Sequence, residues 1–334
     1  MTEATVRGGR AGHPGPAMHF IRNTIGTQNL SLLIALILLI AIFGAIRPDA
    51  FFLGRTVTNI VLGVSILGVL AIAQTMVIVS GGLDISVGSA TGLCTLVAAL
   101  AIEASGSAAV GVLAALAAGA AAGCINGLII TFGRVNPVIT TLGTMAAFRG
   151  LALIISDGRS IGILNQDFRW IGSGFVWFLP VPVFLMLLVA VLFFCFMRFT
   201  IPGRNVYAMG GNPVVARLAG IGLTKYRIAI YTVSGIAAGL AGVILAARTG
   251  SGQPVSGSEG LELEAITAAI LGGCALAGGK GTIVGAVLAV LILGVLKTGM
   301  LLVGLQSFWQ DVAKGALLVG AVMIQELRFR RSGD

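Results

Sequence analysis

The feature that most constrains this chain is a series of long apolar runs, which fill most of its 334 residues. The first run covers residues 30–46. The later runs lie at roughly 57–80, 86–102, 108–132, 138–155, 176–197, 228–247, 265–277, 283–303 and 311–324. Most of them approach the ~20 residues that a helix needs to cross the hydrocarbon core of a bilayer. Charged residues make up only 10% of the chain, whereas soluble domains carry about 25%. We therefore expect an all-α, polytopic integral membrane protein.

Glycine is unusually frequent, with 49 residues, and it divides one of the runs. The run at 265–277 is short, and it is edged by Gly272-Gly273 and Gly278-Gly279. Glycine in apolar sequence is typical of closely packed or locally broken membrane helices. We predict a bundle of about ten transmembrane helices with broken or re-entrant glycine-rich segments, and nine spans is the alternative.

Three segments follow from this pattern. Residues 1–29 are polar and are expected to form a flexible cytoplasmic tail, and 327–334 a basic cytoplasmic tail. The membrane domain covers 30–326 and includes a long basic loop at 198–227. No signal-peptidase site follows the first run, because Arg47-Pro48-Asp49 comes next. We interpret that run as an uncleaved anchor.

The distribution of positive charge predicts the orientation. With a cytoplasmic start and ten spans, 13 of the 21 Lys and Arg residues lie in cytoplasmic segments. These are Arg7, Arg10, Arg22, Arg134, Arg198, Arg204, Arg217, Lys225, Arg227, Lys280, Arg328, Arg330 and Arg331. Cytoplasmic loops of membrane proteins carry an excess of Lys and Arg. The count indicates that both termini are cytoplasmic.

The net charge of +9 does not indicate nucleic-acid binding, because the basic residues are distributed in short stretches between apolar runs. The four cysteines stand in apolar sequence without a C-x-x-C pair, so neither a disulfide framework nor a zinc site is expected. Both histidines, His13 and His19, fall in the N-terminal tail. This excludes a histidine-based catalytic or metal site in the membrane domain, and we expect no catalytic residues.

The nearest approach to a phosphate-binding loop is Gly278-Gly279-Lys280-Gly281. A Walker A motif requires a Gly five residues before its Gly-Lys pair and Ser or Thr after the Lys. Here Cys274 and Gly281 occupy those positions. The chain is therefore expected to bind no nucleotide, cofactor or metal.

Asp84 is the most informative ionisable residue, because it stands between two apolar runs beside Ser86. A carboxylate there is costly unless it caps a helix, pairs or meets water. Two interpretations stay open: Asp84 or Ser86 caps the helix that begins near Val87, or Asp84 contacts substrate or a gate. Four neutral hydrogen-bonding residues near the spans suit a polyol substrate or act as contacts between helices. They are Gln74, Asn126, Asn136 and Gln253.

The loop 198–227 contains the signals of a short helix. Asn212 followed by Pro213 is a good N-cap and first-turn pair, and Gly220 is a good terminator. They predict a helix of about two turns over 213–219. So short a helix is unstable in isolation.

The predicted helix places Val214, Val215 and Leu218 on one side. An exposed apolar face implies a partner on which it docks. The alternative is a surface helix that lies against the protein's own bundle.

Glycines also recur at helical spacing within the spans. Gly119, Gly123 and Gly127 form one such face, and Gly235 with Gly239 forms another. Such faces let helix backbones approach closely, and packing within the chain is favoured over dimerisation. A faint echo between 80–86 and 271–277, each with a double glycine, is consistent with a pathway that internal repeats build.

Three segments carry a resemblance to a known family. These are 80–89, 203–221 and 264–285, and the similarity runs in order from about residue 29 to 326. The chain resembles the ribose-type permeases of bacterial ABC importers. The form Leu-Asp-Ile-Ser-Val-Gly-Ser at 83–89 is similar to the sugar branch, from which the branched-chain amino-acid and nucleoside permeases differ. Cys274 departs from the family, where Thr or Ser is common.

The resemblance implies a permease subunit in the bacterial inner membrane. Its partners would be a second permease subunit, identical or paralogous, a periplasmic sugar-binding protein and ABC ATPase subunits that hold ATP and Mg²⁺. The segment 203–221 matches the family's ATPase-coupling loop. Its candidate residues are Gly203, Arg204, Gly210, Gly211, Asn212, Pro213, Val214, Val215, Arg217, Leu218 and Gly220.

A rival hypothesis is an ion-coupled secondary transporter of a small polar solute. Such a protein usually needs carboxylates within the membrane for the coupling ion. Here Asp84 is nearly the only candidate, which favours the importer permease.

Overall fold

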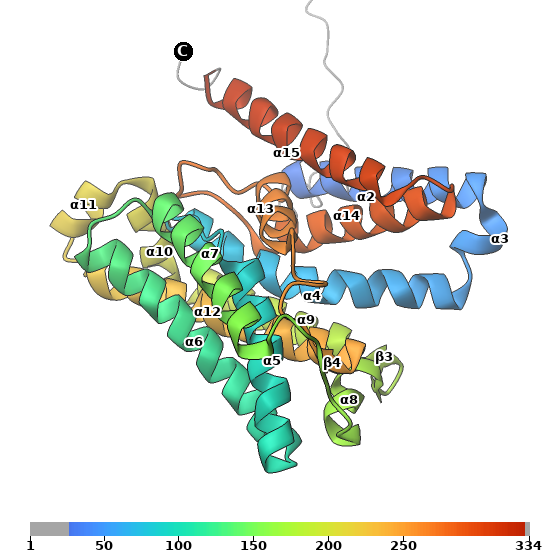
Figure 1. Cartoon of the computed structure of the whole chain (residues 1–334). Coiled ribbons are helices and arrows are strands. Elements are labelled where there is room, and N and C mark those ends of the chain that lie inside the picture. The colour runs from blue at the N-terminus through green and yellow to red at the C-terminus, as the bar shows by residue number, and fades with distance from the viewer. Residues whose placement is uncertain (1–26, 331–334) are drawn as a thin grey trace, which may run out of the picture.

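A computed structural model describes residues 27–330, and these residues are predominantly helical (Figure 1). The helices are α2 (Thr27–Ile46), α3 (Pro48–Phe51), α4 (Gly54–Val79), α5 (Val87–Ser105), α6 (Ala108–Phe132), α7 (Pro137–Ser156), α8 (Gln166–Ser173), α9 (Val181–Phe199), α10 (Ile201–Gly211), α11 (Pro213–Leu218), α12 (Leu223–Thr249), α13 (Leu261–Leu271), α14 (Ile283–Leu302) and α15 (Ser307–Arg330). Two short antiparallel pairs complete the described part. They join β1 (Ile161–Gly162) to β4 (Ser251–Gly252), and β2 (Phe175–Val176) to β3 (Leu179–Pro180).

Eight of the described helices are long and apolar enough to cross a membrane, namely α2, α4, α5, α6, α7, α9, α12 and α14. The all-α polytopic class is thereby confirmed. The run at 265–277 forms only the 11-residue helix α13, which ends at Leu271 before the glycines that follow. It is thus a broken segment, as its edges predicted.

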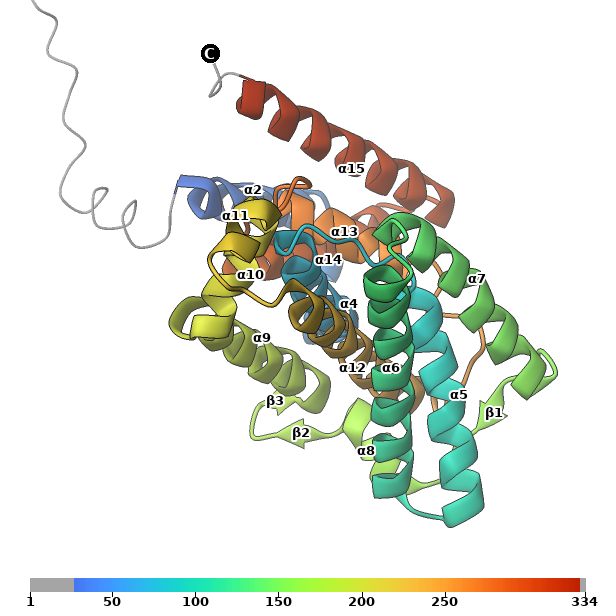
Figure 2. The same ribbon diagram turned by 90° about the vertical axis from the view of Figure 1, so that its left-hand side faces the viewer.

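The connections between helices gather at two ends of the described molecule. At one end, α10 and α11 lie beside the α4–α5 and α13–α14 connections. The α13–α14 connection meets the end of α4, where Gly279 N donates to Val79 O at 2.8 Å. It also meets α10, where Tyr207 OH donates to Gly281 O at 3.0 Å. We call this the α11 end. At the other end, Asn165 Nδ2 donates to Gly106 O at 2.8 Å, and β1 pairs with β4. Figure 2 shows α8 and the β2–β3 hairpin far from α11.

The centre of the bundle is built from α4 and α12, whose long middle stretches are buried. Glycines permit α6 and α12 to touch along their backbones. A Cβ on Gly119 would overlap Gly235 O, and one on Gly123 would overlap Tyr231 O. A Cβ on Gly235 would in turn overlap Gly119 O. The prediction that these glycine faces pack within the chain is confirmed.

Several predicted boundaries differ from the structure. The apolar run at 176–197 becomes a helix only from Val181, because 175–180 form the β2–β3 hairpin, which turns at Trp177 with a φ of 59°. The N-terminal tail 1–29 lies outside the described residues except for 27–29, which begin α2. The C-terminal tail 327–334 is described as far as Arg330, where α15 ends.

Candidate functional site

The short helix α11 forms as its flanking residues predicted. Asn212 Oδ1 accepts hydrogen bonds from Val214 N at 3.0 Å and Val215 N at 3.1 Å. Gly220 has a φ of 81° and follows the end of the helix, where a residue without a side chain adopts the left-handed conformation at no steric cost. The predicted cap and terminator are confirmed.

The apolar side of α11 is open to the surroundings. Val214 is 66% exposed, Val215 58% and Leu218 83%. Ala216 faces the opposite way and is buried at 3% exposure, so it anchors the helix to the body. These three side chains therefore form one exposed apolar side of the helix, and they do not pack against the described bundle.

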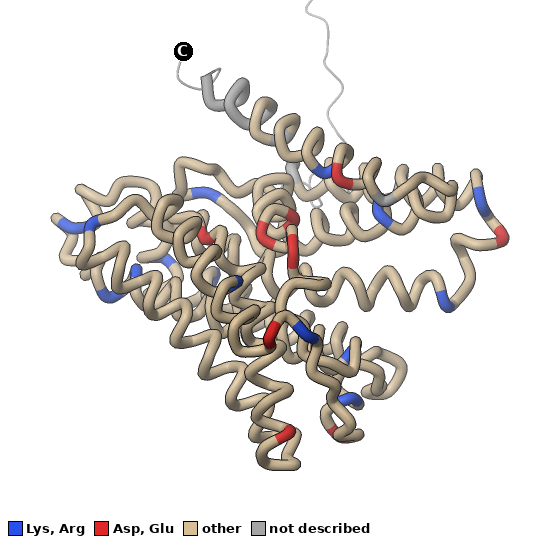
Figure 3. The backbone as a smooth tube through the Cα atoms, in the orientation of Figure 1, with Lys and Arg blue, Asp and Glu red and all other residues tan. Residues whose placement is uncertain are grey.

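Within the predicted loop 198–227, residues 201–211 form the helix α10. Thr200 Oγ1 accepts from Gly203 N at 3.0 Å, and Pro202 stands in the first turn. The buried side of α10 carries Gly203, Val206, Met209 and Gly210. Arg204 and Arg217 are exposed. Together α10 and α11 present a basic and apolar surface at the α11 end, where Figure 3 shows several Lys and Arg residues.

Three glycine-containing segments meet beneath α10. A Cβ on Gly210 would overlap Val79 O, at the end of α4. A Cβ on Gly278 would lie 2.9 Å from Gly81 Cα and 2.8 Å from Gly210 O. Gly81 and Gly278 both have positive φ, at 84° and 87°. We call this contact of Gly81, Gly210 and Gly278 the glycine junction; it joins α10 to the α4–α5 and α13–α14 connections.

The segments 80–86 and 271–277, which each carry a double glycine, do not meet through those glycine pairs alone. The contact to Gly81 comes from Gly278, which follows the second segment, whereas Gly272 packs against the backbone of α14 at Ala286. A Cβ on Gly211 would meet only Gly279 Cα, at 4.0 Å, and Gly211 ends α10 without a positive φ.

Asp84 is 1% exposed and accepts three hydrogen bonds. Its Oδ1 receives them from Ser86 N at 3.0 Å and Ser86 Oγ at 2.7 Å, and its Oδ2 from Ser234 Oγ at 2.9 Å. Asn126 Nδ2 donates to Ser86 Oγ at 2.8 Å. Burial raises the pKa of the Asp84 carboxyl, and the hydrogen bonds from Ser86 and Ser234 oppose that rise.

The predicted helix cap at this position is correct only in part. Ser86 occupies the N-cap position of α5, but its side chain makes no capping hydrogen bond to the helix. Asp84 instead accepts from the backbone N–H of Ser86, one residue before the helix begins. The carboxylate thus fixes the start of α5 and ties it to α12 through Ser234.

The other predicted polar residues do not join this cluster. Gln74 is fully buried in α4, and neither atom of its side-chain amide has a hydrogen-bond partner among the described residues. Asn136 is exposed and caps α7, where its Oδ1 accepts from Val138 N at 2.8 Å. Gln253 lies at the opposite end, with its backbone N–H bonded to Thr95 Oγ1 at 2.8 Å.

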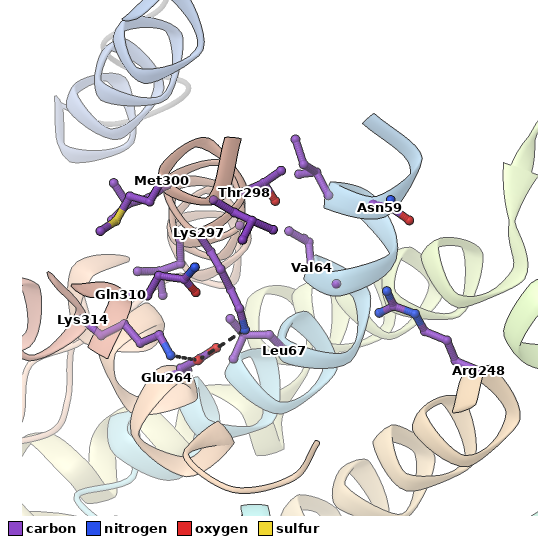
Figure 4. Close-up of a pocket in the computed structure, with 16 residues that line it drawn as sticks. Asn59, Val64, Leu67, Arg248, Glu264, Lys297, Thr298, Met300, Gln310 and Lys314 are labelled. Atoms are coloured by element: carbon purple, nitrogen blue, oxygen red, sulfur yellow. Dashed lines mark ion pairs between the residues drawn. The ribbon is translucent and has the colours of Figure 1, made fainter. Parts of the chain in front are cut away.

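A cavity of about 260 Å³ lies on the side of the bundle away from α11, between α4, α12, α13, α14 and α15 (Figure 4). Glu264 is its central charge, since its Oε1 lies 2.6 Å from Lys314 Nζ and 3.9 Å from Lys297 Nζ. Arg248 and Gln310 also line it. Sequence reasoning missed these residues, although Lys297 interrupts an apolar run and was a signal.

Comparison with known proteins identifies the family. The model of a family described as the branched-chain amino acid transport system / permease component matches residues 56–323. The ribose import permease protein of Escherichia coli strain K12 is 40% identical over 296 residues, which cover 87% of this chain and 92% of the relative.

Two further relatives agree. The ribose import permease protein of Bacillus subtilis strain 168 is 39% identical over 299 residues, covering 89% of this chain and 92% of the relative. The D-allose transport system permease protein of Escherichia coli strain K12 is 35% identical over 294 residues, covering 87% and 90%. No solved structure matches the chain significantly. The family match covers well over half of the chain, and this protein therefore belongs to the family of transport-system permease components.

Proposed function

We propose that this chain is the membrane permease subunit of an ATP-driven importer, and that its substrate is a monosaccharide, a ribose-like pentose or a hexose. The relatives named as ribose and allose permeases, at 35–40% identity, support this substrate class. The permease family supports a transport component rather than an enzyme, and it favours this function over an ion-coupled secondary transporter.

The observation that carries the proposal is the exposed apolar face of α11. Val214, Val215 and Leu218 stand on a capped helix that the body holds through buried Ala216. A surface of this kind fits a groove in a partner protein. We assign the groove to an ABC ATPase subunit, which binds ATP and Mg²⁺. Its movement during ATP hydrolysis is transmitted to the permease through α10 and the glycine junction.

Two further partners complete the proposed importer. A second permease subunit, identical or paralogous, shares the translocation pathway, and a periplasmic binding protein delivers the sugar at the end opposite α11. Asp84, Ser86, Asn126, Gln74, Asn136 and Gln253 are the candidates for the pathway or its gate. Gln74 is the strongest of these candidates, because a buried amide without a hydrogen bond is costly unless a ligand or water supplies the partner.

We place the α11 end in the cytoplasm of a bacterial cell and the chain in the inner membrane, with both termini cytoplasmic. The excess of Lys and Arg in the segments at this end supports the orientation. Ten spans follow if α13 with its glycine-rich continuation crosses as a broken segment and α15 as the last helix.

The test is uptake into reconstituted vesicles that contain this permease and its ATPase, with ATP enclosed and the binding protein and sugar added outside. We expect ATP-dependent accumulation of the sugar that the purified binding protein retains, with the proton gradient collapsed. Uptake that needs an ion gradient and ignores ATP would refute the proposal and restore the ion-coupled alternative.

A further inference from the structure

A second cavity, of about 470 Å³, opens at the α11 end of the molecule. It lies between the α4–α5 connection, the α6–α7 connection and the first turns of α12. Its volume falls within the ~300–1,000 Å³ of small-molecule sites. Neither the Asp84 cluster nor the exposed face of α11 accounts for it.

The charged side chains that line this cavity are all positive. Arg134 and Arg227 line it, and none of the described residues that line it is acidic. Neither guanidinium forms an ion pair with any carboxylate whose side chain the structure describes. Arg134 stands in the left-handed region with a φ of 54°, which is uncommon for a residue with a side chain. Two unpaired guanidinium groups in one cavity favour an anionic ligand.

The start of helix α7 borders the same cavity. Asn136 and Pro137 also line it and begin the 20-residue helix α7, whose N-terminus carries partial positive charge.

We propose that this cavity binds the phosphate group of a small cytosolic molecule, a sugar monophosphate. Arg134 and Arg227 would hold the phosphate, since a guanidinium matches phosphate oxygens in bidentate geometry. Ser80 and Asn136 would meet the sugar hydroxyls. The placement in the cytoplasm rests on the proposed function. A sugar monophosphate is the product class of any reaction that phosphorylates the imported sugar.

Occupancy of the cavity would act on transport through its wall. Ser80, Gly81 and Gly82 form part of the wall, and the same connection holds Asp84 and meets the glycine junction. Tyr231 lines the cavity as well, and its hydroxyl donates to Leu83 O at 3.1 Å. A ligand that binds this arrangement stabilises it against others, so the sugar phosphate slows transport.

The test measures binding to the purified full-length permease in nanodiscs of uncharged lipid, which leave both faces open and need neither ATPase nor orientation. Ribose 5-phosphate, inorganic phosphate and ribose are titrated by calorimetry. We expect ribose 5-phosphate to bind and ribose not to bind. Arg134→Gln and Arg227→Gln should each weaken binding by about tenfold or more, because hydrogen bonds to charged groups are the strong ones.

One variant provides the control. Lys225→Gln removes an exposed positive charge two residues from Arg227 that does not line the cavity, and it should bind as the unaltered protein does. Each variant is first shown to be monodisperse with an unchanged melting temperature, so that a loss of binding is not a loss of fold.

Absence of ribose 5-phosphate binding, or binding that survives in Arg134→Gln/Arg227→Gln, would overturn the proposal. The proposal would also be overturned if an anionic lipid co-purified through these two arginines while soluble phosphates failed to bind. The phosphate that the cavity holds would then belong to a lipid headgroup. Loss of sugar-phosphate affinity once the ATP-binding subunit is assembled would also overturn it, since an acidic side chain of that subunit would fill the cavity. None of these results depends on whether the transporter imports sugar.

Discussion

Asp84 Oδ2 accepts a hydrogen bond of 2.9 Å from Ser234 Oγ, which joins the α4–α5 connection to the middle of α12. The other oxygen, Oδ1, holds Ser86 at the start of α5. One buried carboxylate thus ties the α4–α5 connection to the start of α5 and to α12, close to the glycine junction. Its hydrogen bonds define what the side chain must supply, which is acceptors at two positions.

Asp84→Asn tests whether the charge itself is needed. The amide oxygen can accept from Ser86 as Oδ1 does, and the amide N–H₂ can donate to the Ser234 hydroxyl, which also accepts. We expect the Asn variant to insert and to keep most of its ATP-driven uptake. Asp84→Ala leaves buried donors unpaired, each at a cost of about 1–3 kcal/mol, and should lower both the melting temperature and uptake.

Both variants are measured for uptake in vesicles and for thermal stability in detergent. An Asn variant that is as stable as the unaltered protein but does not transport would show that the negative charge acts in the gate.

Gly210 and Gly211 are neighbours with opposite surroundings. A Cβ on Gly210 would overlap Val79 O and lie 2.7 Å from Gly279 N, whereas a Cβ on Gly211 would meet only Gly279 Cα, at 4.0 Å. We expect Gly210→Ala to cost about 1–3 kcal/mol of stability through overpacking and to reduce coupling to the ATPase. Gly211→Ala should be nearly neutral.

The matched pair is compared by melting temperature and by ATP hydrolysis that the loaded binding protein stimulates. Equal effects of the two substitutions would show that the glycine junction is not a rigid contact between α10 and α4.

Local signals account for the parts of the fold that the sequence predicted. Asn212, Pro213 and Gly220 act within one helical turn of themselves, so the cap and terminator of α11 could be identified without tertiary information. The glycine faces of α6 and α12 could also be predicted, because helical spacing alone places Gly119 and Gly123 on one side. The sequence did not predict which helix they contact, and the structure shows that they contact Gly235 and Tyr231 of α12.

Tertiary contacts decided the rest. Trp177 and Phe178 are apolar, so hydropathy counted them in a span, yet they form an exposed turn between β2 and β3. The partner of Asp84 is 150 positions away at Ser234, and no pattern in the sequence links them. Arg134 and Arg227 counted only as cytoplasmic charge, because their shared cavity arises from the packing of α6 against α12.

The orientation is tested with a single cysteine at Ser160, which is exposed between α7 and β1 at the end opposite α11. In a background without Cys94, Cys124, Cys195 and Cys274, we expect Ser160→Cys to react with an impermeant thiol reagent added to the periplasmic side. The control is Thr224→Cys, exposed at the start of α12 near α11. It should react only after the inner membrane is disrupted, and the reverse pattern would invert the topology.

Val215→Asp tests the docking surface most directly. Burial of a valine side chain in a partner's groove contributes about 1.5–3 kcal/mol, and a carboxylate at that contact adds a desolvation cost. The substitution leaves α11 itself intact, because Val215 stands in the first turn after Asn212, where an acidic residue favours the helix. We expect loss of co-purification with the ATPase subunit, loss of ATP hydrolysis stimulated by the loaded binding protein, and normal membrane insertion.

The matched control is Val176→Asp, the same change at an exposed valine of the β2–β3 hairpin. It lies at the opposite end of the molecule, so the ATPase should co-purify with it as with the unaltered permease. If Val215→Asp also retains the ATPase subunit and full stimulation, the apolar face of α11 is not the coupling contact. The exposed Val214 and Leu218 would then need another partner, and the proposed function would lose the observation that carries it.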